Sequence, residues 1–209
     1  MSFTVDQHSY KRLGVSFRYA HMNFKADSVS NGIDSPQSSY SESGESGRVE
    51  WSRNNYYRLT GNLSLPNKIE MATQFDAGDG ARYNITTGTD NNGDGNFNDR
   101  PAYASSPGPG VYATRFGLLT TNTVNGDVPR DVGTMPGPIH LNMNLSRTFI
   151  LNPKDKDRPL PFTVNARSAN LLNHTNVTAV NSVLSSSTVG QPIAAEAARR
   201  IEFGARFSF

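Results

Sequence analysis

The last eleven residues of the chain, Arg199–Phe209 (RRIEFGARFSF), alternate strictly between apolar and polar side chains. This period of two predicts a β-strand with one apolar face. A strand that crosses a bilayer needs about 9 to 11 residues, apolar toward lipid and polar toward the lumen, with aromatic residues near the interfaces. The segment meets these requirements, although a strand on the core of a water-soluble sheet shows the same alternation. The apolar positions are Ile201, Phe203, Ala205, Phe207 and Phe209.

The same alternation recurs along the chain and predicts six further strands. Pro66 and Asn67 interrupt it once, which indicates a hairpin turn of two or three residues. The chain is therefore expected to be all-β, with about seven antiparallel strands. The alternating stretches are a short start at Phe3 and Val5, Leu13 to Phe24, Tyr56 to Leu65, Lys68 to Asp76, Ile139 to Leu151, and Phe162 to Arg167.

Short and long connections alternate between these predicted strands. The long ones are rich in Ser, Gly, Asn, Asp or Pro and are expected to be loops. Within them, Ala81–Thr86 resembles a strand, and Ala194–Arg200 (AAEAARR) is expected to hold a short helical turn. The short connections are expected near Asp6 to Lys11, at Pro66, and at Asn152 to Arg158; the long ones are Ala26 to Asn54, Gly78 to Gly137, and Asn173 to Glu196.

This alternation favours an outer-membrane β-barrel, because such barrels have short periplasmic turns and long extracellular loops. Loops beyond about 12 to 15 residues are uncommon in compact soluble domains. The sequence thus predicts a partial antiparallel transmembrane β-barrel, with residues 1–209 as the C-terminal part of one barrel domain. Seven strands do not close a bacterial barrel, so the protein is expected to continue upstream of Met1.

Composition narrows the classes of function. The 20 basic and 18 acidic residues give a net charge of +2, which offers no case for nucleic-acid binding. No cysteine is present, so disulfides and cysteine nucleophiles are excluded. The sequence has no nucleophile elbow, phosphate loop or dinucleotide fingerprint, and we expect no enzymatic activity. The histidines have no metal-ligand spacing; they are His8, His21, His140 and His174.

Several motifs resemble the C-terminal barrel of TonB-dependent outer-membrane receptors, in particular the Oar-like group, which carries a carboxypeptidase-regulatory-like domain. The resemblance covers most of the chain but only the end of such a receptor. Ala169–Asn173 (ANLLN) departs from the group's Phe-Asn-Leu-Phe-Asn. The motifs are VEW (Val49–Trp51), RLTGNLSLP (Arg58–Pro66), YNITTGTDNNGDGNFNDRP (Tyr83–Pro101), SANLLNHTN (Ser168–Asn176) and the terminal RRIEFGARFSF.

The resemblance implies a barrel of about 22 strands that encloses a plug. The implied function is energised uptake of an unidentified ligand across the bacterial outer membrane, driven by the TonB energy-coupling complex. The plug and the coupling segment are expected outside this chain. The resemblance also implies that the barrel-assembly machinery reads the terminal aromatic residue, Phe209. The apolar positions before it on the same predicted strand, Ile201, Phe203 and Phe207, are expected to form the assembly signal together with it.

One loop has the spacing of a calcium site. Oxygen-bearing side chains recur at every second position, and Gly95 stands where an EF-hand-type loop makes its sharp turn. The twelfth position, normally a bidentate acid, is Pro101, so Asp99 is the acid that would substitute. Without calcium, the same residues would form an Asx-rich turn. The candidate ligands are Asp90, Asn92, Asp94, Asn96, Asn98 and Asp99.

Two further expectations follow from the pattern of strands. Aromatic residues flank the strand ends on the long-loop side, where an outer-membrane barrel has an aromatic girdle. The alternative architecture is a secreted β-sandwich that binds calcium or carbohydrate and folds alone in water. The girdle residues are Trp51, Tyr56, Tyr57 and Tyr83.

Overall fold

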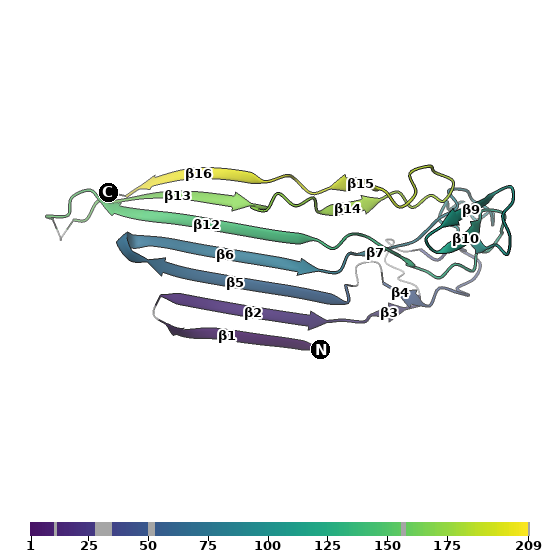
Figure 1. The fold of residues 1–209 in the computed structure, drawn as a ribbon, viewed down its shortest axis with the longest axis horizontal. Coiled ribbons are helices and arrows are strands. Elements are labelled where there is room, and N and C mark those ends of the chain that lie inside the picture. Colours follow the sequence, from purple (N-terminus) through teal and green to yellow (C-terminus); the bar gives the residue numbers. More distant parts are fainter. Residues whose placement is uncertain (11, 28–34, 50–52, 156–157, 209) are drawn as a thin grey trace.

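The computed structural model describes residues 1–10, 12–27, 35–49, 53–155 and 158–208, and its main feature is one antiparallel sheet of seven strands (Figure 1). Strands of this sheet that are consecutive in the chain are also neighbours in the sheet, and β1 and β16 form the two edges. The predicted all-β antiparallel class is confirmed. The strands are β1 (Ser2–Tyr10), β2 (Leu13–His21), β5 (Asn55–Leu65), β6 (Ile69–Gly78), β12 (Ile139–Ile150), β13 (Pro161–Ala169) and β16 (Arg200–Phe207).

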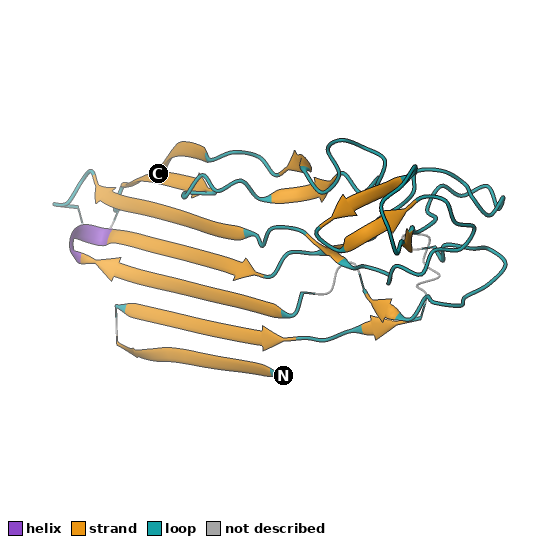
Figure 2. Ribbon diagram, turned by 45° about the vertical axis from the view of Figure 1, so that its right-hand side comes forward, coloured by secondary structure: helices purple, strands orange, loops and turns teal. Residues whose placement is uncertain are grey.

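All the short turns of this sheet lie at one end and all the long connections at the other, as predicted (Figures 1 and 2). The turn between β5 and β6 is the 3₁₀ segment η1 (Pro66–Lys68). Asn67 has a φ of 63° there, a left-handed conformation that Asn tolerates better than most residues. No helix in the described part of the chain is long or apolar enough to cross a membrane.

Two local predictions were wrong. The first strand does not end before Asp6, because β1 continues to Tyr10 and Asp6 pairs with Ser16 of β2. Ala194–Arg200 forms no helical turn: it begins in β15 (Pro192–Ala195) and ends in β16. The Glu196 N–H instead donates to the Asn176 carbonyl at 2.8 Å, so pairing across the connection overrides the helix propensity of alanine.

The long connections contain short strands that the composition did not predict. β7 is shorter than the expected strand at Ala81–Thr86 and pairs with β11. Three others form a small sheet in the order β8-β10-β9, and two further pairs are β3-β4 and β14-β15. The bounds are β3 (Lys25–Ala26), β4 (Gly47–Arg48), β7 (Arg82–Tyr83), β8 (Ala102–Tyr103), β9 (Val111–Thr114), β10 (Gly117–Thr120), β11 (Gly133–Thr134) and β14 (Val177–Val180).

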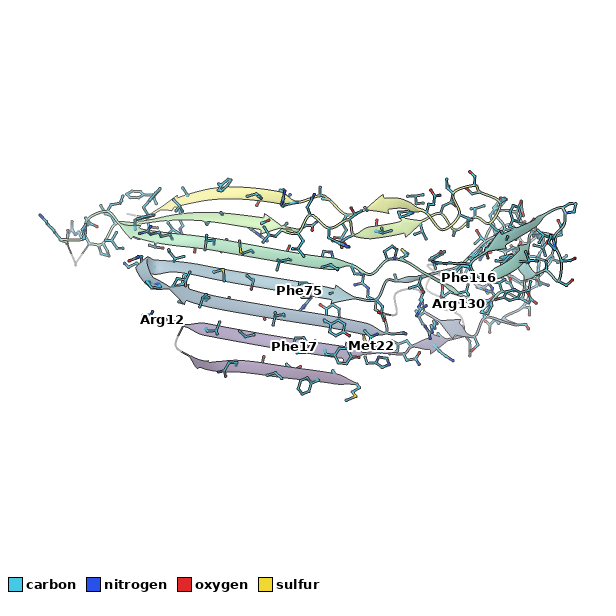
Figure 3. All side chains as sticks on the ribbon, viewed as in Figure 1. Arg12, Phe17, Met22, Phe75, Phe116 and Arg130 are labelled. Atoms are coloured by element: carbon cyan, nitrogen blue, oxygen red, sulfur yellow. The ribbon has the colours of Figure 1, made fainter. Side chains whose placement is uncertain are left out.

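The hydrophobic core lies among the long connections and not against the sheet. Its residues come from two connections, those between β6 and β12 and between β13 and β16; they are Tyr83, Ile85, Leu119, Val128, Val180 and Leu184. Among the described apolar residues of the seven-stranded sheet, only Ala20 is buried. Phe203, in β16, is 83% exposed. The connections, with their side chains, gather at one end of the sheet (Figure 3).

The register of the strands aligns their apolar positions into one continuous face. Phe17, Leu59 and Phe75, for example, occupy one row across β2, β5 and β6. Because directly paired residues point to the same side of a sheet, this row and those parallel to it form what we call the apolar face. The opposite side, which includes Arg18, is called the polar face.

Candidate functional site

Two aromatic rows lie at opposite ends of the apolar face, each on three of its seven strands. The loop-end row comprises Phe3, Tyr19 and Tyr57, which pair across β1, β2 and β5. The rings of Tyr19 and Tyr57 stack with their centroids 5.0 Å apart. The turn-end row comprises Phe149, Phe162 and Phe207 of β12, β13 and β16.

The separation of these two rows can be counted in residues along β12. Its residue Ile139 is level with Tyr57, because both pair with Ala77. Phe149 of the turn-end row lies ten residues further along the same strand. Between the rows the face carries Leu, Ile, Val, Met, Phe, Ala and few polar side chains.

On the polar face, Asp76 is the centre of a hydrogen-bonded cluster. Its Oδ1 accepts from Arg58 Nε at 2.6 Å and from the Tyr56 hydroxyl at 2.5 Å. Its Oδ2 accepts from Gln74 Nε2 at 2.6 Å. Arg58 also stands beside Arg18 in the register. The strands thus gather fixed charges and amides on one side of the sheet, at the end nearest the long connections.

The aromatic residues expected at the strand ends do not share one surface. Tyr57 lies on the apolar face as predicted, but Tyr56 lies on the polar face, because neighbours in a strand point to opposite sides. Tyr83 is buried in the core of the connections. Trp51 lies outside the described residues.

The predicted calcium loop folds as a turn in which carboxylates accept backbone N–H groups. Asp90 Oδ1 accepts from Gly93 N at 2.7 Å and from Asp94 N at 3.1 Å, and its Oδ2 accepts from Gly95 N at 2.9 Å. Gly93 and Gly95 have φ values of 74° and 85°, which the sharp turn requires. The loop therefore has the local conformation of an Asx-rich turn.

The first long connection holds this loop in place. Ser39 N donates to Asp94 Oδ2 at 2.7 Å, and Asn96 Nδ2 donates to Ser39 Oγ at 3.2 Å. Asn92 Nδ2 donates to the Gln37 carbonyl at 2.7 Å. Asn98 Nδ2 donates to the Pro36 carbonyl at 2.9 Å. Four of the six predicted ligands thus contact residues 36–39.

The three carboxylates of the loop do not converge on one point. Among the described residues, no group of three or more His, Asp or Glu side chains is placed to hold a metal ion. Asp94 faces Ser39, whereas Asp99 is fully buried and accepts from Asn91 N at 2.6 Å. Burial raises the pKa of the Asp99 carboxyl, and the nearby charges of Asp90 and Asp94 raise it further. Calcium binding by this loop stays a prediction.

A buried ion pair stands beside the loop. Arg100 Nη1 lies 2.8 Å from Glu45 Oε1, and both side chains are almost fully buried. Arg100 also donates to the carbonyls of Val128 and Gly44. No pattern in the sequence predicts this pair, because its two residues belong to different connections and no local spacing joins them.

The three long connections also line a polar cavity of about 310 Å³ that is open to the surface. Ser35 comes from the first connection, Asn84 and Asn98 from the second, and Ser182 from the third. Asn98 Oδ1 is buried, with no hydrogen-bond partner among the described residues. The cavity therefore offers polar groups from segments far apart in the sequence to a small ligand.

The terminal strand places its predicted signal residues on the apolar face. Ile201, Phe203 and Phe207 pair with Ser168, Ala166 and Phe162 of β13, and all three are exposed at the sheet edge. Phe209 lies outside the described residues.

The turn after β13 corresponds to the ANLLN segment of the sequence. Asn170 and Asn173 have φ values of 50° and 53°, and Asn173 Oδ1 accepts from Arg199 N at 3.0 Å, just before β16. Comparison with known proteins adds no relative to these observations: no family model, no curated protein and no solved structure matches the chain.

Proposed function

We propose that the chain is the C-terminal segment of an outer-membrane β-barrel receptor of the TonB-dependent, Oar-like kind, which takes up an unidentified ligand. The observation that carries the proposal is the continuous apolar face between two aromatic rows. In water this surface would be unfavourable, since soluble monomers rarely expose contiguous apolar patches larger than a few hundred Å². In a bilayer it would face the acyl chains.

The separation of the aromatic rows fits a membrane. Ten residues of β-strand span about 33 Å at about 3.3 Å per residue. At a strand tilt of about 40°, this length corresponds to about 25 Å along the membrane normal, the height of the apolar band of outer-membrane barrels. The rows at Tyr19 and Phe149 would then lie at the two interfaces, where aromatic side chains are favoured.

The polar face would line the interior of the barrel. Charges such as those of Arg58 and Asp76 are tolerated there because the interior is wet or filled by a plug. The open edges at β1 and β16 support a larger barrel, since each would pair with further strands in a closed sheet. In this arrangement the energy-coupling complex would act through segments outside this chain.

The packed long connections would form the extracellular entrance. They have their own core, and all three line the polar cavity, which is where an incoming ligand would first bind. The short turns would face the periplasm, together with the end of β16 that the barrel-assembly machinery would read. No chemical reaction is part of the proposed function, which is binding and transport.

Two substitutions at adjacent positions of β12 test the proposal. Leu145→Arg places a charge on the apolar face near mid-height, which costs about 2 to 4 kcal/mol in the middle of a bilayer. Asn144→Arg places the same charge on the polar face and serves as the matched control. We expect Leu145→Arg to reduce the amount of full-length protein that fractionates with the outer membrane and migrates heat-modifiably, and Asn144→Arg to leave it unchanged.

The alternative of a secreted calcium- or carbohydrate-binding β-sandwich makes the opposite prediction. Both variants would then be soluble and equally abundant, and the isolated chain would unfold cooperatively in water without detergent. Recovery of the wild-type protein in the soluble periplasmic fraction would also overturn the membrane proposal.

A further inference from the structure

Arg147 is the only Arg, Lys, Asp or Glu side chain that the described strands place on the apolar face. It pairs with Ile69 of β6 and Val164 of β13, both apolar. Among the described residues, no carboxylate oxygen lies within 4.0 Å of its guanidinium. The face therefore carries one positive charge without an acidic partner in the described part of the chain.

The side chain of Arg147 extends toward the turn end of the sheet. Its Cζ lies 4.6 Å from the centroid of the Phe149 ring, which belongs to the turn-end aromatic row. Long basic side chains on apolar surfaces extend in this way to bring the charge to a polar layer. In the proposed membrane orientation, the guanidinium would reach the headgroups of the periplasmic leaflet.

An apolar groove of about 260 Å³ begins at Arg147. Ala166 creates it, because this small residue pairs with Leu145 on one side and with Phe203 on the other. The groove thus runs between two bulky side chains and has the charge at one end. Its lining on the apolar face consists of Ile69, Leu145, Arg147, Val164, Ala166 and Phe203.

We propose that Arg147 and this groove bind one anionic phospholipid of the leaflet on the short-turn side. The guanidinium would donate to the headgroup phosphate, a geometry that suits its planar fork. One acyl chain would lie in the groove over Ala166. Charge complementarity favours this occupant, because a single cation next to an apolar groove matches an amphiphile with an anionic head. The inference rests on the proposed membrane orientation.

Native mass spectrometry of the full-length protein in nanodiscs tests the proposal. The discs contain equal amounts of phosphatidylglycerol and phosphatidylcholine, and the retained lipids are counted. We expect the wild type to retain one phosphatidylglycerol. Arg147→Gln should weaken the preference for phosphatidylglycerol about fivefold, the loss expected for one basic group at an anionic surface. Ala166→Leu, which fills the groove, should lower the retention of both lipids.

Arg206→Gln is the matched control, because Arg206 lies on the polar face of β16, paired with Thr163. It should retain lipid as the wild type does. Equal retention by Arg147→Gln and the wild type would overturn the lipid site, as would wild-type protein that retains both lipids equally. The comparison of the two lipids on the wild-type protein needs no variant, so it tests the lipid site even if a variant does not insert.

Heat-modifiable migration of each preparation reports insertion separately from lipid retention. Wild-type protein that inserts but shows no lipid preference refutes the lipid site alone. Wild-type protein that does not insert refutes the proposed function and the lipid site together.

Discussion

Glu45 and Arg100 form an ion pair of 2.8 Å inside the packed long connections, with their side chains 1% and 3% exposed. The pair joins the first connection to the second, directly after the Asp90–Asp99 loop. Its position shows that the connections form a specific structure and do not simply collapse against each other. Charges this deeply buried are stable only when they are paired and hydrogen-bonded.

We predict that Glu45→Gln loosens the connections strongly. The substitution leaves the Arg100 charge buried without its acid, which costs about 3 to 5 kcal/mol. Hydrogen exchange of residues 87–128 in the full-length protein should rise accordingly. Glu45→Leu combined with Arg100→Met removes both charges and should recover most of the protection. Equal exchange in Glu45→Gln and the wild type would show that the pair contributes nothing.

The raised pKa of Asp99 predicts a dependence of loop stability on pH. A carboxyl whose pKa is raised by burial stabilises the folded loop when protonated, so the stability falls as the pH rises from the ordinary value of 3.8 through the raised pKa. Asp94 has a lowered pKa, because the N–H groups of Asn96 and Ser39 donate to it; its contribution is lost only below 3.8. At pH values above 3.8, the raised pKa of Asp99 is therefore what makes the folded loop less stable.

Hydrogen exchange of residues 87–100, corrected for the intrinsic rates, measures this effect. The calcium-free wild type should be better protected at mildly acidic than at neutral pH. Asp99→Asn should flatten that difference, and Asp127→Asn, a control elsewhere in the same connection, should preserve it. Greater protection of the wild type at neutral pH would contradict the sign.

Calorimetry of the folded protein tests calcium binding by the Asp90–Asp99 loop directly. If the loop binds calcium, Asp90→Ala and Asp94→Ala should each lower the affinity about tenfold or more, because each removes a charged ligand. Asp127→Ala should leave the calcium affinity unchanged, since the Asp127 carboxylate lies outside the loop and accepts a hydrogen bond from Tyr103 N at 2.8 Å. Calorimetry of the folded protein that detects no heat of binding at millimolar calcium would rule the site out.

Phe209 is predicted to serve assembly and not transport. Deletion of Phe209, or Phe209→Ala, should reduce the amount of protein that reaches the outer membrane and leave the ligand affinity of the inserted protein unchanged. If the residue only adds apolar burial, about 1.5 to 3 kcal/mol, insertion would be normal and only the melting temperature would fall. Ser208→Ala is the control at the neighbouring polar position. Normal insertion with lost ligand binding would contradict both explanations.

The sequence by itself determined the strands of the seven-stranded sheet and the direction in which their side chains point. Alternation with a period of two is a local property, so Ile139 to Leu151 and Phe162 to Arg167 predicted β12 and β13 to within two residues at either end. The alternation of short and long connections is equally visible in the sequence, because the length of each connection is the number of residues between two predicted strands. Local pattern failed where a stretch was short and polar, as at Asp6, or rich in alanine, as before Arg200.

Only the tertiary structure decided which apolar residues are buried and which partners the loop residues have. The core around Leu119 and the Glu45–Arg100 pair join segments that approach each other because the strands bring their connections to one end of the sheet. The alignment of Phe149, Phe162 and Phe207 into one row likewise depends on register, which is set between strands. Contacts of this kind depend on how distant segments meet in space, and no local period in the sequence encodes that meeting.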